Sequence, residues 1–395
     1  MSTLKVDAIR HNSATSDAIT TAADGTCTAK LTGMTGGGAF ANRNKIINGD
    51  FIIHQRGGTI ASSSGVYTID RWRAYRTGDS SGGFSVQQSL ASYPQTNISG
   101  VIDNFKSSAL ITVTSAGSAA ANNNCKFQQR IEGSNVYDLA FGTVAAKKVT
   151  VSFYVKCSLT GDFGVALVNG SHNRSNVQLY TVNSASTWER KIVTFNGDTS
   201  GTWTFGTGIG LQLMFDMGSG SSKHASSTGT WLSGEYHGTT SSVKLIHTNG
   251  ATIQFAGVQL EEGSVATSFE FRNYADELAH CQRYFYKISA AASGTGSHKH
   301  IGTMQYYGGQ YPYGKMLDLP VPMRTIPTGS FTGDIRAWTA SGSNNGSFTT
   351  INFDRNDNKF LASNGSTTNQ NSGGSGNATP ITLYPSSTMS ADAEL

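Results

Sequence analysis

The sequence has little charge, few prolines and no dense basic patch. Charged residues make up 14% of its 395 residues, with 29 Lys and Arg against 25 Asp and Glu. The nearest approaches to a basic run are Lys147-Lys148 and Arg71-Trp72-Arg73, which are too short to predict a nucleic-acid-binding face. No nucleic-acid partner is therefore expected. Seven prolines are also too few for a disordered linker composition.

Cysteine pairs and long apolar runs are absent as well. The four cysteines lie far apart and form no Cys-x-x-Cys motif, which argues against a metal or redox site and predicts free thiols. No cofactor is expected. The first ten residues contain no apolar core, so no signal peptide is predicted, and no apolar run is long enough to span a bilayer. Such a protein would leave a cell by lysis or as part of a particle.

The sequence is instead rich in glycine and in short runs of alternating apolar and polar residues. The sequence contains 46 Gly, well above the usual share of about 7%. From Val149 to Val155, apolar residues alternate with polar ones, which is the period of a strand with one face in a core. Similar runs recur to residue 260, including 125–131, 202–205 and 243–247, and Asn-Gly pairs at 196–197 and 249–250 are hairpin signals. We therefore predict an all-β protein built on a jelly-roll β-sandwich.

The chain is longer than one core usually holds, so several parts are expected. In chain order they are an extended N-terminal arm (1–41), the jelly roll (42–272), a helical spacer (273–288) and a smaller C-terminal β domain (289–395). The arm has too few large apolar residues to form its own core, and Leu4, Val6 and Ile9 are its candidate attachment residues.

The spacer carries signals for the start of a helix. Asn273 can cap its N-terminus, and acidic residues at 276 and 277 suit the positive end of the helix dipole. Tyr274, Leu278, Cys281 and Phe285 fall on one helical stripe. This stripe fits packing on its own domain and packing against symmetry mates in a fibre about equally well.

Aromatic residues in the C-terminal part are the main candidates for ligand binding. Tyr306, Tyr307, Tyr311 and Tyr313 lie in a Gly-rich stretch, and we add Trp338 to this set. Flat rings with polar edges suit sugar rings, so glycan binding is predicted here. The alternative is that these rings pack inside the domain or at a subunit interface. By contrast, we expect Trp231, in another polar loop, to plug an open end of the jelly roll.

Other motifs are better explained by ordinary structure. His298 and His300 could hold a metal ion in a ring of symmetry-related strands, but exposed histidines are far commoner, so no metal site is predicted. The adjacent Glu261 and Glu262 point to opposite faces of a strand and cannot act as a catalytic pair, and no pattern supports a distant pair such as Asp70 with Glu132. No hydrolase motif is present, so an enzyme is not predicted.

Several blocks of the sequence resemble one known group of proteins. They occur in the same order along the chain: 42–51 with 55–57, 67–72, 149–156, 231–234 and 254–285, followed by shorter likenesses at 321–324 and 390–395. These blocks are similar to phage tail-fibre and other virion-appendage proteins, especially those of marine phages. The arm before them looks like the attachment segment of such fibres.

This resemblance implies a homotrimer on the virion, whose jelly roll resembles carbohydrate-binding modules. It implies that residues 1–41 dock on a phage tail, adaptor or capsid protein, and that the outer parts recognise host cell-surface polysaccharide. It supplies no catalytic motif and does not identify ligand residues. The predicted function is a structural fibre or spike subunit that mediates host-glycan recognition. The alternatives are a polysaccharide-degrading tailspike and a purely structural capsid-bound or adaptor-linked fibre.

Overall fold

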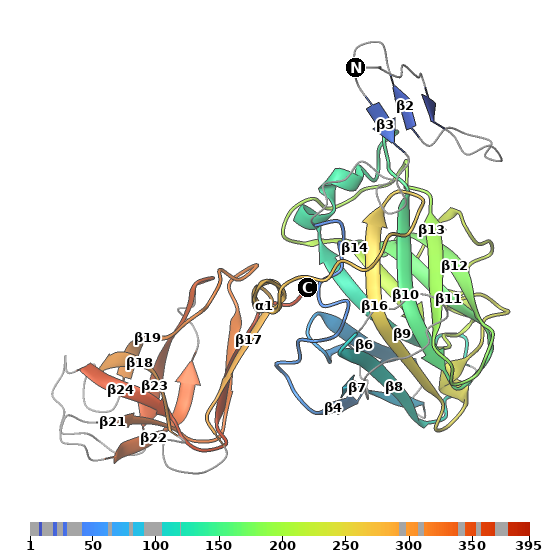
Figure 1. Ribbon diagram of the computed structural model, residues 1–395. Helices are drawn as coiled ribbons and strands as arrows, with labels where there is room; N and C mark the ends of the chain where they lie inside the picture. The colour runs from blue at the N-terminus through green and yellow to red at the C-terminus, as the bar shows by residue number, and fades with distance from the viewer. Residues whose placement is uncertain are drawn as a thin grey trace, which may run out of the picture.

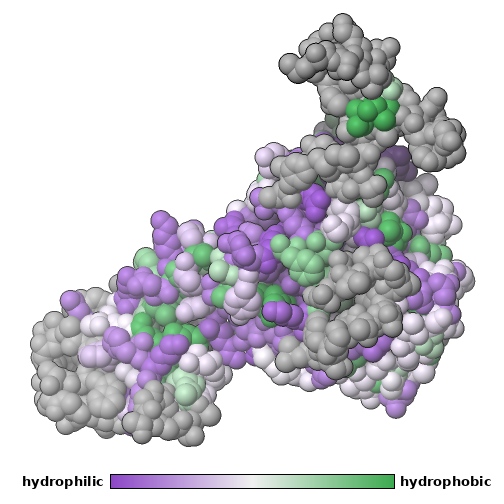
Figure 2. Space-filling view, viewed as in Figure 1, coloured by the Kyte–Doolittle hydropathy of each residue, from purple (hydrophilic) through white to green (hydrophobic). Residues whose placement is uncertain are grey.

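The computed structural model describes most of the chain and shows two β-rich units with α1 between them (Figure 1). The described residues are 8–9, 19–21, 27–29, 42–61, 65–78, 82–90, 105–118, 120–291, 298–306, 312–338, 344–352, 357–367 and 378–395. In the view of Figure 2 their surface is mostly polar, with small separate apolar patches. No helix in these ranges is both long enough and apolar enough to cross a membrane.

The larger unit consists of two antiparallel sheets packed face to face. The six-stranded sheet has the order β13-β10-β16-β8-β7-β4 and the seven-stranded sheet the order β15-β12-β11-β14-β9-β6-β5. The strands of the first sheet are β4 (Thr59–Ala61), β7 (Gly83–Leu90), β8 (Ser107–Ser115), β10 (Val149–Cys157), β13 (Glu189–Phe195) and β16 (Thr252–Glu262). Those of the second are β5 (Val66–Tyr67), β6 (Trp72–Thr77), β9 (Asn124–Glu132), β11 (Gly161–Asn169), β12 (Arg174–Val182), β14 (Ile209–Asp216) and β15 (Trp231–Ser233). Because the chain passes repeatedly from one sheet to the other, this is a jelly-roll β-sandwich, as the alternation predicted.

Aromatic side chains hold the two sheets together. On β10, alternate residues from Val149 to Val155 belong to the main hydrophobic core, so the period-two pattern does mark the core face, although the polar residues between them are also buried. Rings from opposite sheets meet in this core; the centroids of Phe215 and Phe255, for example, lie 4.3 Å apart. Each buried ring of this kind stabilises the fold by about 1.5–3 kcal/mol.

Two predicted strands of the sandwich are absent from the structure. Residues 202–205 form no strand, because Trp203 turns inward and packs edge-on against Phe141, with centroids 4.8 Å apart. Residues 245–247 form a 3-10 turn, η4 (Leu245–His247), in which Leu245 and Ile246 are buried. In both segments the apolar residues reach the core without pairing in a sheet, so their alternation was a misleading signal.

The Asn-Gly pairs also differ from the two-residue hairpins that they predicted. After Asn196-Gly197 the chain runs to residue 209 before the next strand begins. A Cβ at Gly197 would lie 2.5 Å from the carbonyl oxygen of Lys147, so close backbone approach explains this glycine.

Helix α1 (Tyr274–Gln282) begins where the sequence places it, but residues 285–288 of the predicted helical spacer belong to strand β17 (Phe285–Ser289). Asn273 occupies the N-cap position as predicted, although its side chain makes no capping hydrogen bond, and the two acidic residues lie in the first turn. Cys281 is buried against Ile47 and Ile53 of the sandwich, with Leu278 packed beside them. Tyr274 is 59% exposed, so the buried stripe is shorter than predicted. The contacts of Leu278 and Cys281 favour packing on their own chain.

The C-terminal unit combines a three-stranded sheet with a closed barrel. The sheet order is β17-β25-β20 and the barrel order is β18-β19-β23-β22-β21-β24. Their bounds are β17 (Phe285–Ser289), β18 (Lys299–Tyr306), β19 (Pro312–Asp318), β20 (Thr328–Thr332), β21 (Ile335–Trp338), β22 (Asn344–Asn352), β23 (Phe360–Thr367), β24 (Ala378–Leu383) and β25 (Thr388–Asp392). Within the barrel, β22 and β23 are antiparallel neighbours whose pairing runs from Phe348 with Thr367 to Asn352 with Asn364.

The N-terminal segment contains a small sheet of its own. It consists of β1 (Ala8–Ile9), β2 (Ile19–Thr21) and β3 (Cys27–Ala29) in that order. Ile9 pairs with Ile19 and is 54% exposed. Leu4 and Val6 lie outside the described residues, so the attachment role of all three residues stays a prediction.

A carboxylate pair at the base of α1 gives the fold a pH dependence. Burial, and the charge of Glu277, raise the pKa of Asp50 to about 6. A carboxyl group whose pKa is higher in the folded state adds stability below its unfolded pKa of 3.8, and this contribution is lost as the pH rises through about 6. At pH 8 the charged Asp50 therefore opposes folding.

Replacing Asp50 by asparagine should raise the free energy of unfolding at pH 8 by about 1–3 kcal/mol. The variant should also lose part of the fall in stability between pH 4 and pH 7. Denaturant unfolding at several pH values measures both effects. Asp318→Asn is the control, since the Asp318 side chain is 73% exposed, and it should change little. An Asp50→Asn protein less stable than the parent at pH 8 would contradict this prediction.

Candidate functional site

The structure places the predicted glycan-binding aromatics at strand ends of the barrel. Tyr306 is the last residue of β18, Tyr313 is the second of β19 and Trp338 ends β21. Their side chains, and Tyr307 and Tyr311 altogether, lie outside the described residues. Their binding role therefore stays a prediction.

The register of β18 and β19 does constrain this candidate site. Tyr306 pairs with Pro312, and Gln305 pairs with Tyr313. Paired positions share a face of a sheet and successive positions alternate. In the backbone register, Tyr306 and Tyr313 are therefore one residue out of phase.

The candidate histidines have ordinary structural surroundings. The ring of His298 meets that of Tyr384 edge-on, with centroids 4.3 Å apart, and His300 pairs with Thr382 on β24. Across the described ranges, no group of three or more His, Cys, Asp or Glu side chains is placed to hold a metal ion. Both histidine positions thus have neighbours within the C-terminal unit.

A different candidate is the outer face of the seven-stranded sheet. On β9, Phe127 and Ile131 point into the core, and Lys126, Gln128 and Arg130 alternate with them. This alternation is present in the sequence, where it predicts a strand but no binding face. The residues that complete the face come from strands far away in the chain.

Strand register assembles these residues into rows. Gln128 lies between Arg73 of β6 and Met214 of β14, and Lys126 lies between Tyr75 and Asp216. The next row pairs Arg130 with Gln212. We call the set Arg73, Tyr75, Lys126, Gln128, Arg130 and Gln212 the polar strip.

Gln128 is the unusual member of the polar strip. It is fully buried, and among the described residues neither its amide oxygen nor its amide nitrogen has a hydrogen-bond partner. Most buried polar side chains are hydrogen-bonded, and an unsatisfied one costs about 1–3 kcal/mol. The neighbouring Gln212, in contrast, donates to the carbonyl oxygen of Asn169 at 3.0 Å and accepts from Arg130 at 3.3 Å. Gln128 therefore has hydrogen-bonding capacity that the fold does not use.

Two cations lie against the one aromatic ring of the strip. The Arg73 guanidinium carbon is 5.0 Å and the Lys126 Nζ 4.9 Å from the centroid of Tyr75. Burial lowers the pKa of Arg73, and the charge of Arg130 lowers it further. The strip is thus rich in positive charge.

A loop from the end of β14 to residue 238 forms one border of the strip. Glu235 of this loop pairs with Lys126, with Lys223 at 2.7 Å and with His172 Nδ1 at 3.1 Å. Burial alone would raise the pKa of Glu235, but these three partners hold it well below its usual range. Glu235 therefore stays ionised and anchors the loop over the sheet.

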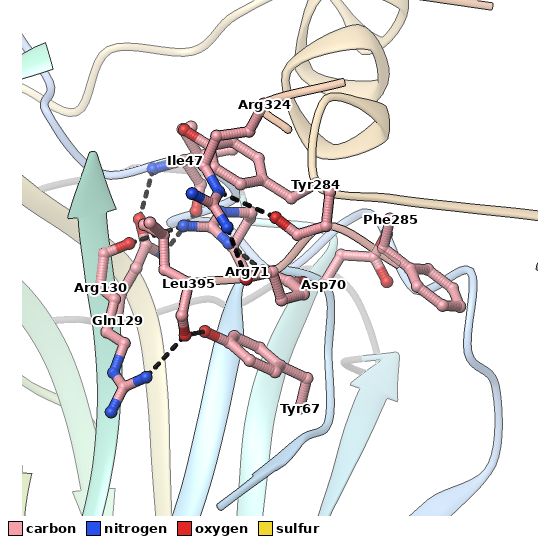
Figure 3. Close-up of polar contacts among 12 residues, drawn as sticks. Ile47, Tyr67, Asp70, Arg71, Gln129, Arg130, Tyr284, Phe285, Arg324 and Leu395 are labelled. Atoms are coloured by element: carbon pink, nitrogen blue, oxygen red, sulfur yellow. Dashed lines mark hydrogen bonds and ion pairs between the residues drawn. The ribbon is translucent and has the colours of Figure 1, made fainter. Parts of the chain in front are cut away.

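The opposite border is formed by the end of the C-terminal unit. Arg130 Nη1 and the Tyr67 hydroxyl both donate to the main-chain oxygen of Leu395, the last residue of the sequence, each at 2.6 Å (Figure 3). These contacts hold residues 394–395 against the sandwich. The polar strip lies between this contact and the loop carrying Glu235.

A serine, a histidine and an aspartate also meet beneath the loop, but not as a catalytic triad. Ser219 Oγ and Asp216 Oδ1 both contact the same ring nitrogen, Nδ1 of His237, at 3.3 Å and 3.2 Å. In a hydrolytic triad the two partners use different ring nitrogens. Nε2 instead faces Asn124, and Ser219 Oγ donates to the carbonyl oxygen of Cys125 at 3.0 Å. This group holds the loop in place.

A hollow of about 500 Å³ lies beside the loop on the same side of the sheet. Its lining is Leu179, Ala225, Ser226, Ser227, Thr228, Thr239, Thr240 and Ser241. It has neither charged nor aromatic residues, so the polar strip is the stronger candidate for specific recognition. Trp231 begins strand β15 and does not lie in a loop as predicted; it packs edge-on against Trp203, with centroids 5.4 Å apart.

Comparison with known proteins finds no matching family model and no matching curated protein. Among solved structures, the enzymatically active domain of tailspike protein 4 of bacteriophage CBA120 is 12% identical, with a TM-score of 0.30. The match covers 56% of this chain and 22% of that one.

Carbohydrate-binding modules are also among the similar solved structures. One of family 4 is 18% identical with a TM-score of 0.26, and the match covers 55% of this chain and 98% of the module. A family 11 module from Clostridium thermocellum, in complex with a mixed-linked tetrasaccharide, is 10% identical with a TM-score of 0.26, over 53% of this chain and 98% of the module. Since these scores are low, the fold assignment depends on the strand order.

Proposed function

We propose that this chain is a non-enzymatic subunit of a phage tail fibre or spike that binds polysaccharide on the host surface. In this proposal residues 1–41 attach a homotrimer to a tail, adaptor or capsid protein of the virion. The sequence blocks that resemble virion appendages, in the same order along the chain, support this role. The proposal differs from the sequence prediction in one respect, because it places a glycan site on the sandwich.

The unsatisfied amide of Gln128 carries the proposal for this site. A sugar hydroxyl both donates and accepts hydrogen bonds, so neighbouring hydroxyls can satisfy the amide oxygen and the amide nitrogen together. Arg73 and Arg130 supply further donors on the same face, and Tyr75 supplies an aromatic surface. A ligand that displaces the long side chains around Gln128 would recover the free energy that its burial costs.

The surroundings of the acidic residues support the non-enzymatic part of the proposal. Glu261 accepts hydrogen bonds from the backbone nitrogen of Thr267 at 2.8 Å and from its hydroxyl at 2.7 Å. Glu262 forms a separate ion pair with Lys147 at 2.8 Å. These glutamates are engaged with different partners, whereas glycoside hydrolysis requires two carboxyl groups that flank one bond.

Replacing Gln128 by methionine tests the site directly. The full-length variant should bind host polysaccharide about tenfold more weakly than the parent, because an amide that contacts the sugar is lost. Its free energy of unfolding should be unchanged or up to about 1–3 kcal/mol higher, since an unsatisfied polar group is removed. Calorimetric titration with polysaccharide extracted from host cells and denaturant unfolding measure the two quantities.

The matched control is Gln254→Met in the six-stranded sheet, where the Gln254 amide oxygen is also buried without a partner among the described residues. It should leave binding unchanged. Tyr306→Ala and Trp338→Ala test the barrel in the same titrations. If these two variants lose binding and Gln128→Met does not, the site lies on the barrel. The polysaccharide should keep its length during incubation, and shortening would contradict the non-enzymatic role.

A further inference from the structure

We infer that the polar strip recognises an acidic polysaccharide, whose carboxylate groups bind between Arg73 and Arg130. This inference rests on the proposed function, because it names the ligand class of the same site. Three observations carry it: a local surplus of positive side-chain charge, two arginines that pair with no Asp or Glu side chain of the described residues, and the unsatisfied amide of Gln128 beside them.

Positive charge is concentrated around the strip. Arg73, Lys126, Arg130 and Lys223 are four cations, and the carboxylate of Glu235 is the one that pairs with the two lysines. Counted over these five side chains the surplus is three, which compares with a formal charge of +4 for the whole chain. A cleft with one sign of charge attracts ligands of the other sign.

The buried carboxylate next to Lys126 does not remove this surplus at the surface. Asp216 is 1% exposed and is hydrogen-bonded to His237 beneath the loop. Burial would raise the pKa of Asp216, but the hydrogen bond from His237 and the charge of Lys244 hold it at about 2. The charge of Lys244 therefore offsets that of Asp216.

Arg73 is held in place without an acidic partner. Its Nη1 is buried and makes no hydrogen bond within the described part of the chain, and no ion pair includes its guanidinium group. The guanidinium group is confined between the ring of Tyr75 and the backbone of Gly65, where an added Cβ would lie 1.7 Å from Nη2. Since the side chain is already positioned, little conformational entropy is lost when it binds an anion.

No Asp or Glu side chain of the described residues pairs with Arg130. Its Nε donates to the amide oxygen of Gln212 at 3.3 Å and its Nη1 to the main-chain oxygen of Leu395, the last residue of the sequence, at 2.6 Å. The two arginines repel each other, and a planar carboxylate between them would relieve this repulsion while it accepts paired N–H bonds. Gln128, which lies between them along the face, would then bind a hydroxyl of the same sugar residue.

The test uses the full chain and three uronic acid polymers, polygalacturonate, alginate and hyaluronan. Each is titrated intact and after reduction of its carboxyl groups to alcohols, at 50 mM and 300 mM NaCl. We expect at least one intact polymer to bind about tenfold or more tightly than its reduced form. This difference should shrink at the higher salt concentration, because exposed charges are screened there.

Variants locate the effect within the strip. Arg73→Gln should lower affinity for the intact polymer about tenfold and affinity for the reduced polymer by clearly less, so that the ratio of the two affinities falls. Arg73→Lys should fall between the two, since lysine keeps the charge but not the planar pair of donors. Arg190→Gln, on the six-stranded sheet, is the matched control and should bind like the parent. Denaturant unfolding confirms that each variant is folded.

Each outcome has a defined consequence. Equal affinity for intact and reduced polymers overturns the acidic-ligand inference and leaves the proposed glycan site standing. If the parent protein binds neither the intact nor the reduced polymers, this inference is overturned. The proposed function is then tested separately, by whether Gln128→Met loses binding of host polysaccharide. Equally tight binding of single-stranded DNA would show a general polyanion surface and would also overturn the inference.

Discussion

Replacing Arg71 by methionine is expected to lower the free energy of unfolding by about 3 kcal/mol, the lower end of the usual range for breaking a buried ion pair. Arg71 is 1% exposed and pairs with Glu394, whose side chain is 4% exposed. Its Nη2 also donates to the carbonyl oxygen of Arg130 at 2.6 Å, and its guanidinium carbon lies 3.5 Å from the ring centroid of Tyr284 (Figure 3). One side chain thus joins the sandwich, the segment after α1 and the end of the C-terminal unit.

The loss is large because Glu394 would stay buried with a weaker set of partners. Arg56 also contacts Glu394 at 3.2 Å, but it is shared with Asp70 at 3.5 Å, so it replaces Arg71 only in part. Adding Glu394→Gln to Arg71→Met should restore most of the stability, since the uncompensated charge is then removed. Denaturant unfolding of the parent, both single variants and the double variant measures this coupling.

The same contacts predict how the two units unfold. In the parent the sandwich and the C-terminal unit should unfold together, whereas Arg71→Met should separate their transitions in calorimetry. A loss below about 1 kcal/mol with a single transition would contradict the role given to Arg71. These contacts also make deletion of residues 289–395 a poor test of binding, because the deletion would expose Arg71 and Arg130.

Replacing Asn48 by alanine is expected to cost about 4 kcal/mol, from lost hydrogen bonds and backbone strain together. Asn48 is fully buried and has a positive φ of 57°, a conformation that asparagine tolerates better than alanine. Its side-chain nitrogen donates to the carbonyl oxygens of Ile53 at 2.8 Å and Asp70 at 2.9 Å, and its side-chain oxygen accepts from the Ile53 nitrogen at 2.9 Å.

Two further substitutions separate these contributions. Asn48→Gly should cost about 1 kcal/mol less than alanine, because glycine adopts the positive φ without strain. Asn48→Asp keeps the acceptor but places an oxygen opposite the carbonyl oxygens of Ile53 and Asp70, so it should also be strongly destabilising. Equal losses for alanine and glycine would show that backbone strain contributes little at this position.

Asn48 also connects three of the sequence blocks on which the resemblance depends. The backbone oxygen of Asn48 accepts the indole N–H of Trp72 at 2.9 Å, and its backbone nitrogen donates to Glu277 of α1. The blocks 42–51, 67–72 and 254–285 therefore meet in space. In the sequence these are three separate blocks of similarity. In the structure they contact one another and join the sandwich to α1.

The sequence predicts which residues of β9 face away from the core, but it does not predict which residues of other strands join them in the polar strip. Alternation along 125–131 already separates Lys126, Gln128 and Arg130 from the core residues. Nothing local identifies Arg73 and Gln212 as their neighbours, because β6, β9 and β14 are adjacent only through long-range pairing. The absence of a partner for Gln128 is likewise a property of the folded state.

The sequence by itself determined the all-β class, the inward face of strands such as Val149–Cys157 and the position of α1. These follow from side-chain period and residue preference, which act over a few neighbouring residues. Only the tertiary structure decided the strand order, the burial of Trp203 outside any sheet and the return of Glu394 to Arg71. Those outcomes depend on how whole sheets exclude water and which charges are buried together, and no local pattern contains that information.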